Sequence, residues 1–289
     1  MNALDILMPK DAAQGVARPA QHLTYHDFRR SVVLFCSFRC GSHMFKAALE
    51  RLTGLSVPPE PLNRYYGGEQ GYTIGKFAAE AKSTLPPLSK PRDAAHAFLV
   101  RFFAAQPPEA RVLLDIKYQQ AYALGVTDET LVPMPTPMLL DVMHRGRVPF
   151  VHMIRRDVVS QAISLMIAEK SGSYFATPPL PNQNEPTPAK IRLVPRQVFD
   201  VARNQRLAQL QATALLKSMD VQLMTIAYED LIGPNRAEHY REAMRFMNLY
   251  GDIPPNFSSQ TISQNSMALV ANMAEIRAFV ASQDEALLS

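Results

Sequence analysis

A first group of residues suited to chemistry lies between positions 37 and 43, where the sequence reads Ser-Phe-Arg-Cys-Gly-Ser-His. A turn containing a glycine directly before a helix points several unpaired backbone amides, and the positive end of the helix dipole, at one place. An arginine and a serine add a positive charge and a hydroxyl. The segment therefore predicts an anion-binding loop, and the alternative is a helix cap without a ligand. The candidate ligand-binding residues are Arg39, Cys40, Gly41, Ser42 and His43.

A second group follows an apolar run at 150–154 and consists of Arg155 and Arg156, then Ser160 and Ser164. The two serines are one helical turn apart, so they share a face of the predicted helix. Arginine and serine side chains at this position predict a second anion site. The alternative is an aspartate helix cap beside a pair of surface arginines.

The elements that must position both groups alternate along the chain. Short apolar runs typical of buried strands alternate with segments of helical periodicity, which favours an α/β fold of mostly parallel strands with helices on both faces. The strand-like runs are 31–37, 112–116, 150–154 and 221–226, and the helical segments are 43–52, 158–170, 197–219 and one that ends near 249. Ligands bind at the carboxyl ends of such strands, which is where both groups fall.

The composition fits one globular domain over residues 1–289. Within it, residues 1–25 lack periodicity and are interpreted as a loose arm. Residues 174–192 are rich in proline and asparagine and are interpreted as a lid loop. The late segment 267–281 is interpreted either as a homodimer contact or as a helix that closes the core.

The bulk numbers exclude several classes of function. A net charge of +4, from 30 basic and 26 acidic residues, without a basic stripe, does not favour nucleic acid. Cys36 and Cys40 are the two cysteines of the chain, too few for a disulfide scaffold or a zinc site. We see no secretory signal and no membrane span, and we expect a cytoplasmic protein.

Together these segments resemble the sulfotransferases that use 3′-phosphoadenosine-5′-phosphosulfate (PAPS), in particular the bacterial carbohydrate family that includes the trehalose enzyme. Ser37–His43 is similar to the family's 5′-phosphosulfate loop, T-P-R-S-G-S-T, with Cys40 and His43 in place of serine and threonine. Arg155–Ser164 is similar to its 3′-phosphate motif, R-R-D-x-x-x-Q-A-x-S. Three shorter stretches also match, namely Thr53–Asn63, Ile116–Lys117 and Tyr228–Leu231.

The resemblance implies a P-loop-type fold and transfer of a sulfuryl group from PAPS to a hydroxyl of a small-molecule or glycan acceptor, without a metal ion. It implies that Glu60 is the catalytic base, with Arg39, Lys117 and His43 as further catalytic residues. The alternative for Glu60 is a solvated loop carboxylate, and for Lys117 a lysine that snorkels from the edge of the core. His43 lies at a helix start, where we expect its pKa to fall.

Two other functions remain open from the sequence. One is a P-loop kinase or ATPase, although the loop lacks the lysine of G-x-x-x-x-G-K-[ST]. The other is a non-catalytic nucleotide-binding module. Glu229 and Asp230 are interpreted as orienting neighbours. His152 is interpreted as a satisfied core histidine, and Met138, Met143, Met153 and Met166 as core filling.

Overall fold

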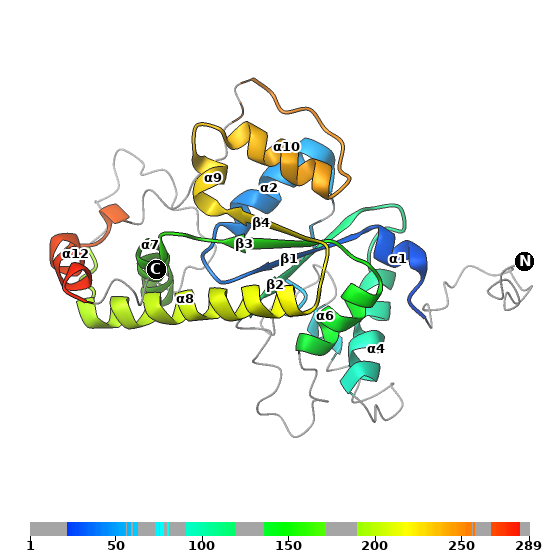
Figure 1. The fold of residues 1–289 in the computed structure, drawn as a ribbon, viewed down its shortest axis with the longest axis horizontal. Coiled ribbons are helices and arrows are strands. Elements are labelled where there is room, and N and C mark those ends of the chain that lie inside the picture. Colours follow the sequence, from blue (N-terminus) through cyan, green and yellow to red (C-terminus); the bar gives the residue numbers. More distant parts are fainter. Residues whose placement is uncertain are drawn as a thin grey trace, which may run out of the picture.

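The computed structural model describes most of the chain (Figure 1). The described residues are 22–55, 57–58, 60–62, 73–74, 76–77, 80, 91–118, 136–171, 190–255, 257 and 267–283. In this part of the chain, every helix is too short or too polar to cross a membrane.

The centre of the described structure is one parallel sheet of four strands, in the order β2-β1-β3-β4. The strands are β1 (Ser31–Cys36), β2 (Val112–Lys117), β3 (Phe150–Ile154) and β4 (Leu223–Ala227). The chain passes from β1 to β2 on one side and returns to β3 on the other side of β1. The carboxyl ends of β1 and β3 therefore flank a topological switch point, where open α/β sheets bind ligands.

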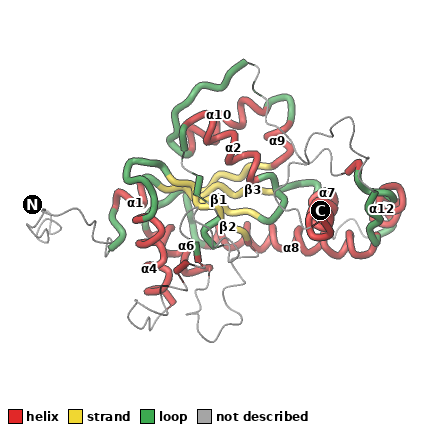
Figure 2. The backbone as a smooth tube through the Cα atoms, turned by 180° about the vertical axis from the view of Figure 1, so that it is seen from behind, coloured by secondary structure: helices red, strands yellow, loops and turns green. Residues whose placement is uncertain are grey.

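Helices cover both faces of this sheet, as Figures 1 and 2 show from opposite sides. One face carries α2 (Ser42–Thr53), α9 (Tyr228–Ile232) and α10 (Arg236–Phe246), and the other carries α4 (Pro91–Ala104), α6 (Thr136–Arg145) and α8 (Pro195–Ser218). The remaining helices are α1 (Tyr25–Arg29), α7 (Val158–Ser171) and α12 (Met273–Ala281). The predicted α/β fold of parallel strands with helices on both faces is confirmed.

The alternation of side chains along each strand divides the core into two layers. In β1, Val33 and Phe35 face the cluster under α4 and α6, whereas Val32 and Leu34 face α2 and α10. All six residues of β1 are buried, as expected for a strand covered on both faces. The same period places every second residue of β2, at 113, 115 and 117, toward α2.

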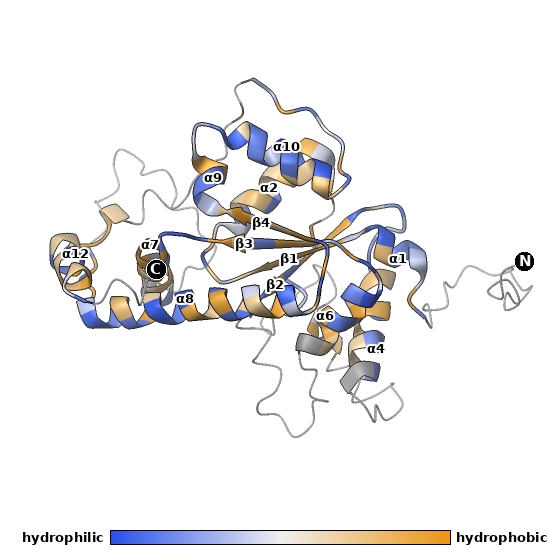
Figure 3. Cartoon of the chain, in the orientation of Figure 1, coloured by the Kyte–Doolittle hydropathy of each residue, from blue (hydrophilic) through white to orange (hydrophobic). Residues whose placement is uncertain are grey.

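A third cluster joins α7, α8 and α12 beyond the carboxyl edge of the sheet. The 24 residues of α8 span about 36 Å, so the helix extends from the sheet to α12 (Figure 1). Hydrophilic and hydrophobic residues alternate along it (Figure 3), as expected for a helix with one buried stripe. The segment proposed as either a dimer contact or a core-closing helix thus packs, in α12, against α8 of the same chain.

The predicted segments match the observed elements closely, with one exception. Helix α1 (Tyr25–Arg29) was not predicted; it begins at the last residue of the predicted arm, and Thr24 and Asp27 cap it with a reciprocal capping box. In α2 the buried residues are Ser42, Phe45, Lys46, Ala48 and Leu49, whereas Ala47 is exposed. Residues 1–21 of the arm and 174–189 of the lid loop lie outside the described residues.

Candidate functional site

The loop after β1 has a backbone that requires its glycine. Gly41 caps α2 at φ 95°, and Arg39 also has a positive φ of 61°. A Cβ atom on Gly41 would lie 2.3 Å from Cδ2 of Tyr228 and 3.3 Å from Cε of Met153. Glycine is therefore needed both for the left-handed conformation and for the close packing on β3 and α9. The amides at the start of α2 lie directly after this turn.

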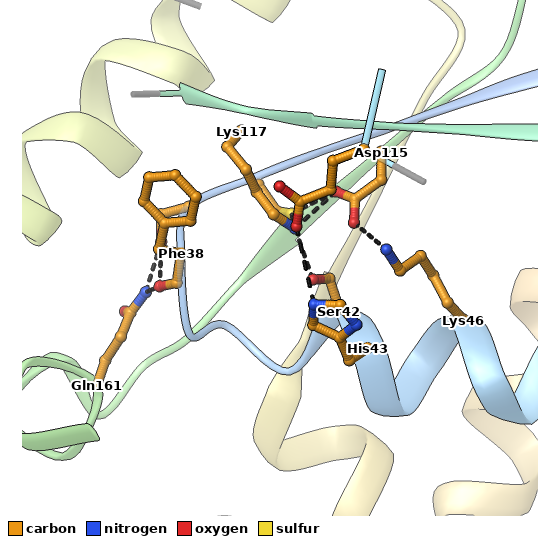
Figure 4. Close-up of polar contacts among 10 residues, drawn as sticks. Phe38, Ser42, His43, Lys46, Asp115, Lys117 and Gln161 are labelled. Atoms are coloured by element: carbon orange, nitrogen blue, oxygen red, sulfur yellow. Dashed lines mark hydrogen bonds and ion pairs between the residues drawn. The ribbon is translucent and has the colours of Figure 1, made fainter. Parts of the chain in front are cut away.

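Lys117, the last residue of β2, points from the sheet toward the start of α2 (Figure 4). Its Nζ donates to Ser42 Oγ at 2.6 Å, to Asp115 Oδ1 at 2.6 Å and to Cys36 Sγ at 3.3 Å. The side chain is only 2% exposed, so the alternative of a lysine that snorkels to solvent is wrong. The ammonium group instead supports the first residue of α2 from below.

A buried carboxylate, Asp115, holds Lys117 in this place. Its second oxygen accepts a hydrogen bond from Lys46 of α2, so one carboxylate bridges two lysines. Burial alone would raise the pKa of Asp115, but Lys117 and Lys46 hold it well below its usual range. Burial alone would likewise lower the pKa of Lys117, yet Asp115 raises it well above its ordinary value. Lys46 and Asp115 were not predicted as site residues. The feature that could have identified them is a charged residue at a position of a helix or a strand that should be buried.

Glu60 and His43 complete the site on the side of α2. Glu60 is 5% exposed, so it is not a solvated loop carboxylate. Its Oε1 lies 3.7 Å from Lys117 Nζ and 3.8 Å from His43 Nε2. Partial burial and the positive charges of Lys46 and Lys117 lower the pKa of His43 to about 4. The expected direction of this shift is confirmed, and the His43 ring is neutral at pH 7.

The second predicted group meets the first through Arg39. The Arg39 Nε donates to Ser164 Oγ of α7 at 3.0 Å, and Arg155 Nη1 donates to the Arg39 carbonyl at 3.1 Å. Arg155 is buried, with its guanidinium 4.5 Å from the centre of the Tyr228 ring. Burial and the charge of Arg155 lower the pKa of Arg39. Two arginines and a serine thus converge at the switch point from different strand ends.

Arg156 and Ser160 lie apart from this meeting point. Arg156 makes a bidentate ion pair with Asp230, at 2.8 Å for both contacts, and its side chain is 59% exposed. The Ser160 hydroxyl donates to Asp157, which also caps α7 by accepting from the Ser160 amide at 2.8 Å. Glu229 accepts from the amides of Arg156 and Asp157. Glu229 and Asp230 are orienting neighbours, as predicted.

The alternative interpretation of this segment was an aspartate helix cap beside two surface arginines. The cap is present at Asp157, but the two arginines are not both on the surface. One arginine, Arg156, is on the surface, whereas Arg155 is buried at 6% exposure. Of the four residues in the predicted second group, Arg155 and Ser164 contact the loop after β1. Arg156 and Ser160 instead bind Asp230 and Asp157.

A buried glutamine ties the two strand ends together. Gln161 Nε2 donates to Ser37 Oγ and to the Phe38 carbonyl at 2.7 Å (Figure 4). Gln209 of α8 donates to the Gln161 side chain at 3.4 Å. These contacts fix the first half of the loop against α7, and sequence reasoning did not single out either glutamine for this role.

Two remaining interpretations concern the core. His152 is fully buried, and its Nε2 pairs with the Tyr118 hydroxyl, while its Nδ1 has no hydrogen-bond partner among the described residues. It is therefore a core histidine that is satisfied on one side. The four methionines pack in the core as predicted: Met143, Met153 and Met166 are buried and Met138 is partly buried.

No family model and no curated protein matches the chain. Among solved structures, the chain is similar to a sulfotransferase from Alicyclobacillus acidocaldarius, with 14% identity and a TM-score of 0.41, over 89% of this chain and 98% of that one. A likeness at this level does not identify an activity.

Proposed function

We propose that the chain is a sulfotransferase that moves a sulfuryl group from PAPS to a hydroxyl acceptor. The observation that carries the proposal is the contact between Arg39 and Ser164 at 3.0 Å. It joins the anion-type loop after β1 to the anion-type group after β3 in one site. A nucleotide with phosphate groups on both sides of its ribose presents two such anions at once.

The residues present fit a ligand of this kind. The missing Cβ of Gly41 leaves the turn in the conformation that aims the first amides of α2 outward. Arg155 is buried with its Nε lacking a hydrogen-bond partner among the described residues, and such a donor is costly unless a ligand satisfies it. Arginine suits phosphate because its fork of donors matches two oxygens.

When bound, PAPS supplies an activated sulfuryl group on a phosphate that leaves as an anion. The side chains of Arg39 and Ser42 and the amides of the loop would hold this phosphate and neutralise its growing charge. Lys117 adds a buried positive charge directly below Ser42. Arg155 and Ser164 would bind the 3′-phosphate, which distinguishes PAPS from ATP. The proposal needs no metal ion.

Glu60 is the base in this proposal. Its carboxylate is buried beside the loop and lies within 4 Å of Lys117 and His43, where it would accept the proton of the acceptor hydroxyl. A pKa of about 4 makes His43 a weak base at neutral pH. We therefore assign His43 to hydrogen bonding at the mouth of the site, next to Glu60.

The acceptor we propose is a carbohydrate or another small molecule with a free hydroxyl, and not a nucleic acid. The cytoplasmic location, the homodimer, the single domain and the lid loop stay predictions.

The test is turnover of PAPS to adenosine 3′,5′-bisphosphate with a panel of sugar acceptors. Glu60→Gln should lower kcat by about 10²–10⁴-fold while the affinity for the bisphosphate stays within about threefold, because the base acts in the transition state alone. The matched control is Glu50→Gln, which makes the same change from carboxylate to carboxamide at an exposed position of α2. This variant should keep full activity. Turnover of ATP with magnesium in place of PAPS would instead identify a kinase or ATPase. Binding of the bisphosphate without any turnover would identify a nucleotide-binding module.

A further inference from the structure

Two buried glutamines lie where the loop after β1 meets α7 and α8. Gln161 of α7 is fully buried, and Gln209 of α8 is 2% exposed. Glutamine side chains are mostly exposed in folded proteins, because an amide loses its hydrogen bonds to water on burial. The Oε1 atom of Gln209 has no hydrogen-bond partner among the described residues, which costs stability. An apolar side chain would avoid that cost, so packing alone does not explain Gln209.

The two side-chain amides use all of their N–H groups. Gln209 Nε2 donates to the main-chain carbonyl of Arg155 at 3.0 Å and to Gln161 Oε1 at 3.4 Å. Gln161 Nε2 in turn donates to Ser37 Oγ and to the Phe38 carbonyl, the latter at 2.7 Å. A primary amide has two N–H groups, so the orientation of both amides is set. If either amide flipped, its oxygen would face a carbonyl.

These contacts close into a ring that joins the ends of β1 and β3. The Arg155 guanidinium donates from Nη1 to the Arg39 carbonyl at 3.1 Å, and Arg39 directly follows Phe38 in the chain. The path therefore runs from Phe38 through the two glutamines to Arg155 and back to the residue after Phe38. Helix α8 belongs to this ring although it lies on the face of the sheet opposite α2 (Figure 1).

We propose that Gln209, acting through Gln161, sets the separation between two anion subsites and thereby selects a nucleotide with phosphates on its 5′ and 3′ positions. The first subsite is the loop after β1, and the second consists of Arg155 and Ser164. Gln209 is a positioning residue, because it holds the backbone of Arg155 and the side chain that braces the loop. The inference rests on the proposed function.

The separation of the subsites matters only for a ligand that occupies both. Once one phosphate is bound, binding of the second is intramolecular, and this gain is lost when the geometry forbids simultaneous contact. Binding groups must be held within about 0.5 Å of their productive positions for such a gain. A phosphate on the 2′ carbon has a different position relative to the 5′-phosphate, so a rigid ring should discriminate against it. A nucleotide with a single phosphate does not depend on the separation.

Replacing Gln209 by methionine keeps the length of the side chain and removes both donors. The Arg155 carbonyl and Gln161 Oε1 then lose their hydrogen bonds in a buried place, and the two strand ends are no longer tied through α8. The affinity for adenosine 3′,5′-bisphosphate should fall about tenfold. The affinity for adenosine 5′-monophosphate should stay within about twofold, because it binds one subsite.

The experiment is calorimetric titration of the full chain with three nucleotides: adenosine 3′,5′-bisphosphate, adenosine 2′,5′-bisphosphate and adenosine 5′-monophosphate. The unmodified protein should bind the 3′,5′-bisphosphate at least about tenfold more tightly than the other two. Gln209→Met should reduce this preference to about twofold or less. The matched control is Gln211→Met, the same change at an exposed position of α8, and it should keep the full preference. A merely structural role would change all three affinities together and leave their ratios unaltered.

Two further variants guard against a fold defect and test the ring itself. Gln209→Asn is one methylene shorter, so it withdraws the amide from both partners while the site stays polar, and it should lose the preference as Gln209→Met does. Gln161→Met should also lose it. Because both glutamines belong to one ring, combining Gln161→Met with Gln209→Met should lower the preference no further than the stronger single change does.

Three outcomes would overturn the inference. The unmodified protein could bind the two bisphosphates equally, the folded Gln209 variants could keep the full preference, or the effects of the two glutamine changes could be additive. If the unmodified protein binds none of the three nucleotides, the proposed function fails separately. Hydrogen exchange of residues 37–43 then decides the inference. Faster exchange in Gln209→Asn would support the brace on the loop, and equal exchange would refute it.

Discussion

Replacing Asp115 by asparagine should destabilise the protein severely. Asp115 is fully buried and bridges Lys46 and Lys117, with its oxygens within 2.6 Å of both ammonium groups. Asparagine keeps the shape of the side chain but removes the negative charge, so two buried positive charges lose their counter-ion. Removing one partner of a buried ion pair costs about 3–5 kcal/mol, against a typical total of about 5–15 kcal/mol for a folded domain.

Urea unfolding measures this cost. With an m-value of about 2 kcal/mol/M, a loss of about 4 kcal/mol lowers the midpoint by about 2 M. Asp141→Asn is the matched control, because Asp141 pairs with Arg145 at 2.9 Å on the surface of α6. Such an exposed pair contributes little to stability, because water and salt screen its charges.

A second variant separates charge from packing. Adding Lys46→Met to Asp115→Asn removes one of the two unpaired cations, so the double variant should regain part of the lost stability. If Asp115→Asn cost no more than Asp141→Asn at an unchanged m-value, the account of the buried lysine bridge would be wrong.

Three further predictions concern single positions. Gly41→Ala should abolish measurable bisphosphate binding in a calorimetric titration, because its Cβ would meet Tyr228 at 2.3 Å. The control is Gly54→Ala, at a glycine that also has a positive φ but has open space around its Cβ. This control should cost only about 1 kcal/mol of stability and leave binding intact. Ser164→Ala should weaken the bisphosphate about fivefold in the same assay, the equivalent of about 1 kcal/mol for one hydrogen bond, and equal affinity would exclude Ser164 from the site. Burial lowers the pKa of His152 to about 4 in the folded protein, whereas the same imidazole in the unfolded chain binds a proton near pH 6.5. About 3 kcal/mol of stability should therefore be lost as the pH falls from 6.5 through 4. His152→Gln should lack that component of the pH dependence in urea unfolding, and identical profiles would contradict the buried neutral ring.

The fold was predictable because each strand has a signal within its own short stretch of sequence. Each of the four is a short apolar run in the sequence, and the turn at Gly41 marks the start of α2 through its backbone requirement alone. Parallel order then follows from the helices between the strands. Helix α1 was missed because five residues carry too little periodicity, although its capping box was visible as Thr24 and Asp27.

The candidate site was only partly predictable. The sequence indicated both anion-type groups, but spacing could not tell which of two adjacent arginines turns inward. That choice depends on Asp230, which holds Arg156 at the surface, and on Tyr228, which stacks on Arg155. The bridge from Asp115 to Lys46 escaped detection because charges at core positions contradict the hydrophobic pattern, and only tertiary structure shows that they neutralise each other.

The most direct test of the account is the melting temperature with adenosine 3′,5′-bisphosphate, with ADP and magnesium as the control. At 100 times its dissociation constant, the bisphosphate should add about 2.7 kcal/mol of stability, which is about 5 °C for a chain of this size. ADP with magnesium should add much less, because it lacks the 3′-phosphate that Arg155 and Ser164 are proposed to bind. Equal stabilisation by both nucleotides, or none by the bisphosphate, would contradict the proposed two-phosphate site.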